Sequence, residues 1–277
     1  MGRYFNVDLV PDMIDGNVAT VIQSNGTDLG FNANDILFDW QEIDVPSGSK
    51  ALTSILMYAM GEDGGAAAAG STHIIFAKSI NGVAPKSLGV VNNTVTGGFD
   101  LGRHFVGACG IGPSGGTASD LGYGSVLGLT IGTIFTSGGI YTPDSNANAN
   151  DGQSWAGVLP QVIDTEPGSG TNIGYDKLYV AAITQNRFDF STGVLADAVA
   201  SGNDISVDGV DPAKCFQIGD TIYKHDSNTP LGTVKSMTDD GDNTYHIILN
   251  ANTAVAVANN DEIVNANAVR LKLGFER

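Results

Sequence analysis

The chain has 277 residues, with 30 acidic and 13 basic side chains, and its formal net charge is −17 at pH 7. This charge repels the phosphates of nucleic acids and the headgroups of anionic membranes, so we expect neither as a direct partner and relate the charge to solubility. The 42% of hydrophobic residues and the 37 glycines predict a packed core of short strands joined by many turns.

Strand patterns dominate the N-terminal two thirds of the chain. Leu52–Met60 could form a strand or a helix of under three turns, and we favour a strand buried on both faces because Thr53 and Ile55 are poor helix formers. No window shows a long amphipathic helix with caps, so we predict an all-β fold. The predicted strands are Val18–Gln23, Ile36–Val45, Leu52–Met60, Thr72–Lys78, Arg103–Ala108 and Leu178–Phe190, the last of which is one long strand or a strand pair.

A polar segment rich in Asn, Ser, Gly and Pro covers Thr142–Thr171. We predict a long surface loop here, and loops of this length inside compact domains are usually functional or form interfaces. Trp155 lies within it and either contacts a partner or pins the loop to its own domain. A second soft boundary near Ala200–Gly202 divides the chain into predicted domains 1–203 and 204–277.

Turn signals recur about every ten residues in the C-terminal quarter, which is the spacing of a small β-barrel or sandwich. We interpret Gly219 and Gly232 as architectural glycines at sharp bends of such a barrel. The expected strands are Ile205–Val207, Cys215–Ile218, Ile222–Tyr223, Leu231–Val234, Tyr245–Leu249, Ala254–Ala258, Ile263–Val264 and Val269–Phe275.

The chain offers few motifs for chemistry. Gly110–Gly115 matches GxGxxG and Ser114 lies in a GxSxG pattern, but the residues that follow do not form the helix that either site needs. Glu42 and Asp44 share one face of a predicted strand, where solvated carboxylates are the simpler interpretation than a glycosidase pair. We therefore predict a non-enzymatic protein with no cofactor and no metal.

Other polar groups also receive structural interpretations. The histidines are scattered without metal-ligand spacing, and we expect them to be structural. Asp239–Asn243 is rich in oxygen ligands and is predicted as a hairpin turn, with calcium binding as the alternative. The two cysteines, Cys109 and Cys215, are expected to be buried free thiols, with a single disulfide as the alternative.

Two parts of the sequence resemble proteins of tailed-bacteriophage particles. The series IGDTIY, LGTVKSM, YHIIL and AVAVANNDEI is similar to small β-barrel modules of virion proteins. The segments FDWQEIDVPSGSKALTSILMYAMG, HIIFAKSINGVAPKSLG and YDKLYVAAITQNRFDFSTGVL resemble the β-sandwich portion of structural proteins from large marine phages. The resemblance implies a jelly-roll-like N-terminal β-sandwich, followed by a small barrel, on the outer surface of a virion.

The resemblance also implies a role as a capsid decoration protein that binds the major capsid protein or other virion proteins, as a homo-oligomer such as a trimer. The docking candidates are the long loop with Trp155 and the N-terminal arm Met1–Met13, which carries Tyr4 and Phe5. The alternative is a receptor-binding adhesin on a tail or fibre, and a hydrolase that uses Ser114 is the third hypothesis.

Overall fold

In the computed structural model, β-strands form almost all of the regular structure. It describes residues 3–14, 30–48, 50–60, 72–96, 101–111, 117–120, 124–130, 159–167, 175–185, 188–189, 193–199, 201–224, 227–241 and 243–277. Within these residues the only helical segments are the short α2 (Leu101–His104) and a 3₁₀ turn at Pro212–Lys214, and neither is long or apolar enough to cross a membrane. The predicted all-β class is confirmed.

The first sheet contains six strands in the order β1-β19-β4-β8-β7, with β9 also paired to β4. All of its pairings are antiparallel. Its strands are β1 (Tyr4–Leu9), β4 (Lys50–Met60), β7 (Thr117–Asp120), β8 (Gly124–Thr130), β9 (Gln161–Ile163) and β19 (Val269–Glu276).

The second sheet follows the order β10-β11-β5-β6, and β3 pairs with β11. Its strands are β3 (Ile36–Pro46), β5 (Thr72–Lys78), β6 (Phe105–Ile111), β10 (Glu166–Pro167) and β11 (Tyr175–Thr184). Side chains from both sheets belong to one buried apolar cluster that includes Leu52, Leu273 and Phe275 of the first sheet and Phe76 and Val180 of the second. A two-stranded pair of β2 (Gly30–Phe31) and β12 (Phe188–Asp189) adds Phe31 to this cluster.

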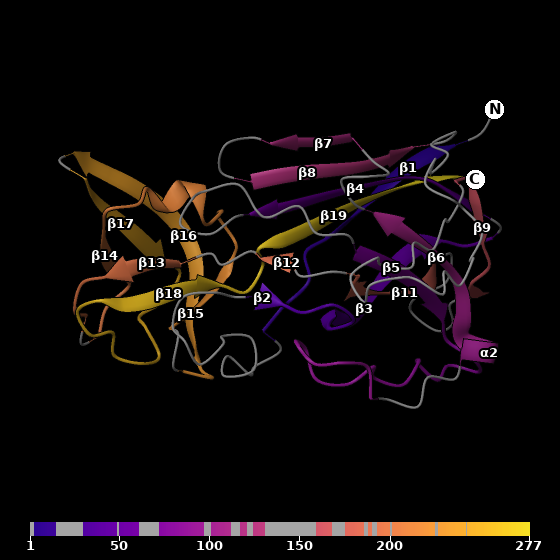
Figure 1. Cartoon of the computed structure of the whole chain (residues 1–277), viewed down its shortest axis with the longest axis horizontal. Coiled ribbons are helices and arrows are strands. Elements are labelled where there is room, and N and C mark those ends of the chain that lie inside the picture. Colours follow the sequence, from indigo (N-terminus) through magenta and orange to yellow (C-terminus); the bar gives the residue numbers. More distant parts are fainter. Residues whose placement is uncertain are drawn as a thin grey trace, which may run out of the picture.

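Six further antiparallel strands pair in a ring, β13-β14-β17-β16-β15-β18, that returns to β13. The ring lies at the left of Figure 1, and the two sheets extend to the right toward both ends of the chain. Its interior is a second apolar cluster centred on side chains such as Phe216, Ile222 and Ile247. The ring strands are β13 (Gly193–Ala196), β14 (Asp204–Asp208), β15 (Thr221–Lys224), β16 (Pro230–Gly241), β17 (Thr244–Leu249) and β18 (Asp261–Asn265).

The domain boundary that the sequence predicts at residue 204 falls inside the ring, because the strands on its two sides, β13 and β14, pair with each other. The ring begins with β13, before that boundary, and the chain leaves the ring after β18, so that β19 lies between β1 and β4 in the first sheet. Figure 1 shows β19 running from the ring into the sheet. The division into domains 1–203 and 204–277 therefore stays a prediction, while the last strand expected in the barrel belongs to the first sheet.

Most other predicted strands in the described residues are confirmed, with four corrections. Ala254–Ala258 is not a strand and contributes only an isolated bridge from Val257 to Val199. The strand β4 is not buried on both faces, because Leu56 is 44% exposed and alternates with core residues. Cys215–Ile218 follows the 3₁₀ turn at Pro212–Lys214 and is not a strand. Within Thr142–Thr171 the structure describes residues 159–167. They contain β9 and β10 with buried Leu159 and Ile163, so this part is not a surface loop. Val18–Gln23 lies outside the described residues.

Candidate functional site

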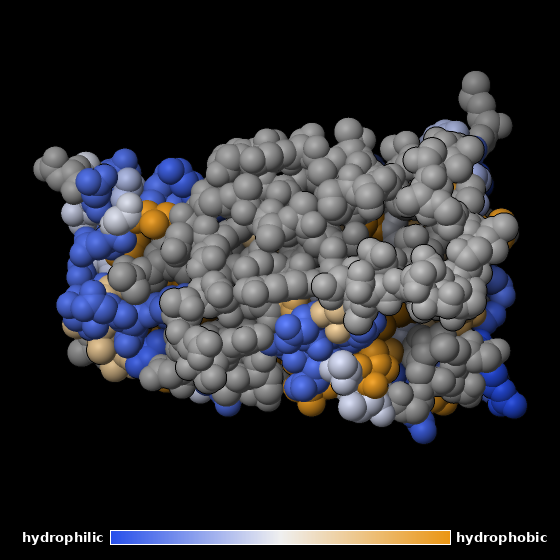
Figure 2. Space-filling view, viewed as in Figure 1, coloured by the Kyte–Doolittle hydropathy of each residue, from blue (hydrophilic) through white to orange (hydrophobic). Residues whose placement is uncertain are grey.

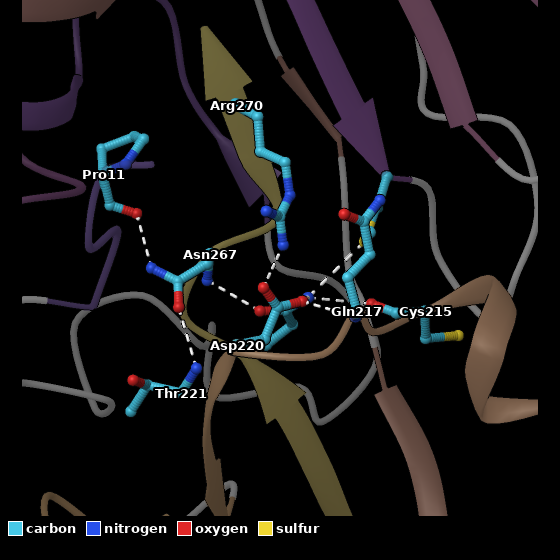
Figure 3. A network of polar contacts seen from close by, with 9 residues as sticks. Pro11, Cys215, Gln217, Asp220, Thr221, Asn267 and Arg270 are labelled. Carbon is cyan, nitrogen blue, oxygen red and sulfur yellow. Dashed lines mark hydrogen bonds and ion pairs between the residues drawn. The ribbon is translucent and has the colours of Figure 1, made fainter. Parts of the chain in front are cut away.

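The first polar site lies at the junction between the ring and the first sheet (Figure 3). Asp220, in the turn before β15, is only 1% exposed and accepts hydrogen bonds from the backbone N–H of Gln217 at 2.7 Å and from Asn265 Nδ2 at 2.8 Å. Its other carboxylate oxygen forms an ion pair with Arg270 of β19. Burial raises the pKa of Asp220, while the Gln217 N–H and the Arg270 charge oppose that rise.

Two asparagines complete this junction network. Asn265 Nδ2 also donates to the Cys215 carbonyl at 2.9 Å, so one amide links the end of β18 to two segments of the ring. Asn267 accepts from the Thr221 N–H at 2.8 Å and donates to the Pro11 carbonyl at 2.9 Å. The network thus ties the N-terminal segment, the ring and β19 together.

The second polar site is a buried ion pair between the two sheets. Lys50 Nζ lies 3.1 Å from Asp176 Oδ2, and their side chains are 0% and 3% exposed. Thr165 Oγ1 lies 2.7 Å from the Lys50 nitrogen and 2.5 Å from the same Asp176 oxygen. Burial acts to raise the pKa of Asp176, but hydrogen bonds from Ser47, Thr165 and Lys50 outweigh it and hold that pKa below its ordinary value.

The third polar site is on the surface of the ring. His246 of β17 places Nδ1 2.8 Å from Asp204 of β14 and Nε2 3.2 Å from Asp240 of β16. The hydrogen bond to Asp204 is the largest cause of a raised His246 pKa, and the charges of both carboxylates act in the same direction. His73 differs, because burial lowers its pKa to about 4. His104 contacts the Lys78 carbonyl, whereas His225 lies outside the described residues.

The predicted docking residues are only partly described. Tyr4 is 72% exposed, whereas the Phe5 ring stacks on Phe275 with centroids 5.2 Å apart and is partly buried against the core. Trp155 lies outside the described residues, as does Ser114 with most of the GxGxxG segment. The docking role of Trp155, Tyr4 and Phe5 therefore stays a prediction.

Tyr4 belongs to a row that the sequence did not reveal. It pairs with Glu276, Glu276 pairs with Ala51 and Ala51 pairs with Val162, so these four side chains lie on one face of the first sheet. Val162 is 70% exposed, and the Tyr4 hydroxyl contacts the Glu276 carboxylate, which raises the Tyr4 pKa. We call Tyr4, Glu276, Ala51 and Val162 the terminal row. The terminal row forms only when β1, β19, β4 and β9, which are far apart in the sequence, pair in one sheet.

Other predicted residues occupy structural positions. Glu42 accepts a hydrogen bond from the Tyr179 hydroxyl at 2.9 Å and pairs with Lys177, and Asp44 is exposed on the same strand, as the solvated-face interpretation expects. Burial, reinforced by Glu42, raises the pKa of Tyr179 to about 12. At the end of β16, Asp239 Oδ1 accepts from the Gly241 N–H, and Gly241 pairs with Thr244 of β17, which confirms the hairpin.

Both cysteines lie in the interior of the described part of the chain. Cys109 and Cys215 are buried and are not joined in a disulfide, as predicted, and burial raises the pKa of Cys109 to about 12. Within the described ranges no group of three or more His, Cys, Asp or Glu side chains is placed to hold a metal ion.

Comparison with known proteins gives no relative from which a function could be transferred. No protein family, no curated protein and no solved structure matches the chain. A function must therefore be argued from the geometry of the chain itself.

Proposed function

We propose that the chain is a non-enzymatic structural protein of a tailed-phage particle that decorates the capsid by binding across joints between its subunits. In this proposal the two sheets form a jelly-roll-like β-sandwich, and the ring of six strands forms a small barrel domain. The partner is the major capsid protein or another virion protein, and the decorating unit is a homo-oligomer on the outer surface of the particle.

The observation that carries the proposal is the terminal row. Tyr4 and Val162 expose 72% and 70% of their surface on one face of the first sheet, separated by three strand spacings of about 4.8 Å each. Both chain ends lie at this end of the sheet in Figure 1, where Arg3 and Arg277 exchange two backbone hydrogen bonds. A paired, well-supported strand row with exposed apolar groups suits a rigid docking surface.

The distribution of buried polar groups also supports a structural role. Asp220 and Arg270 hold the ring to β19, and Lys50 and Asp176 hold the two sheets together. Figure 2 shows mainly hydrophilic residues over the ring at the left, with hydrophobic patches among the described residues toward the lower right. A hydrophilic ring at one end and the exposed Tyr4 and Val162 of the terminal row at the other would orient the molecule toward a partner.

The proposal is tested on particles from a host that produces this chain. Quantitative mass spectrometry should give a copy number on the order of hundreds per particle, as expected of many weak contacts that add by avidity. A handful of copies would instead support the tail or fibre adhesin, and absence from purified particles would refute both virion roles.

A binding assay locates the docking surface. Purified protein is added to particles that lack it, and the Val162→Asp variant should bind at least tenfold more weakly because a carboxylate replaces an exposed apolar side chain of the docking surface. Ile218→Asp is the matched control, since Ile218 is also 70% exposed but lies next to the ring. Equal binding by both variants would place the docking surface elsewhere.

A further inference from the structure

We propose that Lys50 and Asp176 become joined by an amide bond between their side chains, so that the two sheets are linked covalently. The proposal does not depend on the virion role. It rests on the placement of an amine and a carboxylate, 126 residues apart in sequence, within 3.1 Å of each other in the interior.

The two residues lie on the inner faces of opposite sheets. Lys50 begins β4, and its paired neighbour across the strands is Ile163, which is fully buried. Asp176 lies in β11 opposite the fully buried Val45. An amine and a carboxylate held in contact react with an effective concentration of about 10⁵–10⁸ M when their geometry is suitable, and the interior excludes the water that would reverse the step.

Thr165 supplies a path for the proton. It lies between β9 of the first sheet and β10 of the second, where the chain crosses from one sheet to the other. Its hydroxyl accepts a hydrogen bond from Lys50 Nζ and donates one to Asp176 Oδ2. The lowered Asp176 pKa favours the ammonium–carboxylate pair, and a shift of both protons along these bonds converts it into the less populated neutral amine beside a carboxylic acid, which is the reactive state.

The bond changes balance without any co-reactant. The lone pair of Lys50 Nζ attacks Asp176 Cγ and forms the carbon–nitrogen bond. The carbon–oxygen bond to the protonated Oδ2 then breaks, and this oxygen leaves as water with a second proton from the nitrogen. Of the three ammonium protons, two leave in the water and one remains on the amide nitrogen.

Intact-mass spectrometry of the purified full-length chain provides the deciding measurement. After prolonged incubation at neutral pH, the mass should be lower than the sequence mass by one water molecule, and protease mapping should recover a branched peptide that contains Lys50 and Asp176. An unchanged mass with no branched peptide would overturn the proposal.

Variants distinguish this bond from other losses of water. Lys50→Arg keeps the positive charge but has no nucleophilic amine, so it should stay at its sequence mass. If it also lost water, an aspartyl succinimide such as one at Asp208-Gly209 would explain the result, and the proposal would fail. Asp176→Asn should reach the same final mass as the unaltered protein, because it forms the same amide and releases ammonia.

The relay is tested separately. Thr165→Val has a similar shape but no hydroxyl, so the mass change should slow at least tenfold while the product remains the same. An unchanged rate would remove Thr165 from the mechanism. The amide would also close a long loop of chain, which restricts the unfolded state as a disulfide does, so the unaltered protein should unfold at a higher temperature than Lys50→Arg.

Discussion

Arg270 and Asp220 form an ion pair that joins the first sheet to the ring of six strands. Arg270 belongs to β19, and Asp220 lies in the turn before β15, where its carboxylate also accepts hydrogen bonds from Asn265 and Gln217. The Asp220 carboxylate is therefore the centre of the network, because the Arg270 guanidinium, the Asn265 amide and the Gln217 N–H all bind it. Removal of the Asp220 carboxylate takes this acceptor away from the Arg270 guanidinium and the Asn265 amide in a largely buried site.

We expect Asp220→Ala to lower the free energy of unfolding by about 3–5 kcal/mol, the usual cost of breaking a buried charge pair from one side. Asp8→Ala is the matched control, because Asp8 pairs with Lys272 of the same strand β19 but both side chains are more than half exposed. Its cost should be below about 1 kcal/mol. Urea denaturation measures both, and similar costs would show that the junction network contributes little.

Phe275, which stacks on Phe5, allows a test of how much the two end strands of the chain contribute to the free energy of unfolding. Phe275 is fully buried between β1 and β4, so Phe275→Ala should cost about 3–5 kcal/mol through lost burial and the cavity left behind. Leu56→Ala, on the exposed face of β4, should cost about 1 kcal/mol or less. Thermal and urea unfolding of the two variants test this contrast, and equal losses would contradict the assigned faces of the sheet.

The strands could be predicted from the sequence because alternation and turn residues are local signals. Ile36–Val45, Thr72–Lys78 and Tyr245–Leu249 all fall in strands whose ends agree to within about two residues. The prediction of a strand at Cys215–Ile218 was wrong because this segment forms a compact turn. Here Asp220 accepts from the Gln217 N–H, and Phe216 is buried in the ring without any strand partner.

The polar sites and the terminal row could not be predicted, because each depends on pairing across a long stretch of chain. Nothing in the local pattern of Val269–Phe275 shows that this strand leaves the ring and pairs with Tyr4–Leu9. Lys50 and Asp176 likewise look like two ordinary charged residues until β4 and β11 are packed together. Only the placement of the two strands in facing sheets reveals the contact.

The glycines of the ring predict a contrast between two alanine substitutions. Gly219 has φ +95°, in the region that side chains disfavour, although the space around it is open. Gly219→Ala should therefore lower the free energy of unfolding by about 1–2 kcal/mol through backbone strain alone. Gly202→Ala is the control, since Gly202 has no such φ and an added Cβ would meet only Val199 at 3.6 Å. Chemical denaturation that showed equal effects would refute an architectural role for Gly219.

His246 predicts a pH-dependent contribution to the stability of the ring. Its pKa is raised by the hydrogen bond to Asp204 and by the charges of Asp204 and Asp240, so the folded state binds the proton more tightly than the unfolded chain, where the ordinary value is about 6.5. The contribution is therefore complete below about pH 6.5 and is lost as the pH rises through the folded-state pKa. Because the side chains are partly exposed, its size should stay below about 1 kcal/mol.

An NMR titration of the histidine ring protons measures this directly. The His246 midpoint should lie above the ordinary value, and Asp204→Asn should move it downward because the charged hydrogen-bond acceptor is lost. His73 is an internal reference, since its pKa of about 4 keeps it neutral throughout the same pH range. A His246 midpoint at or below the ordinary value, unaffected by Asp204→Asn, would show that β14, β16 and β17 are not linked through this imidazole in solution.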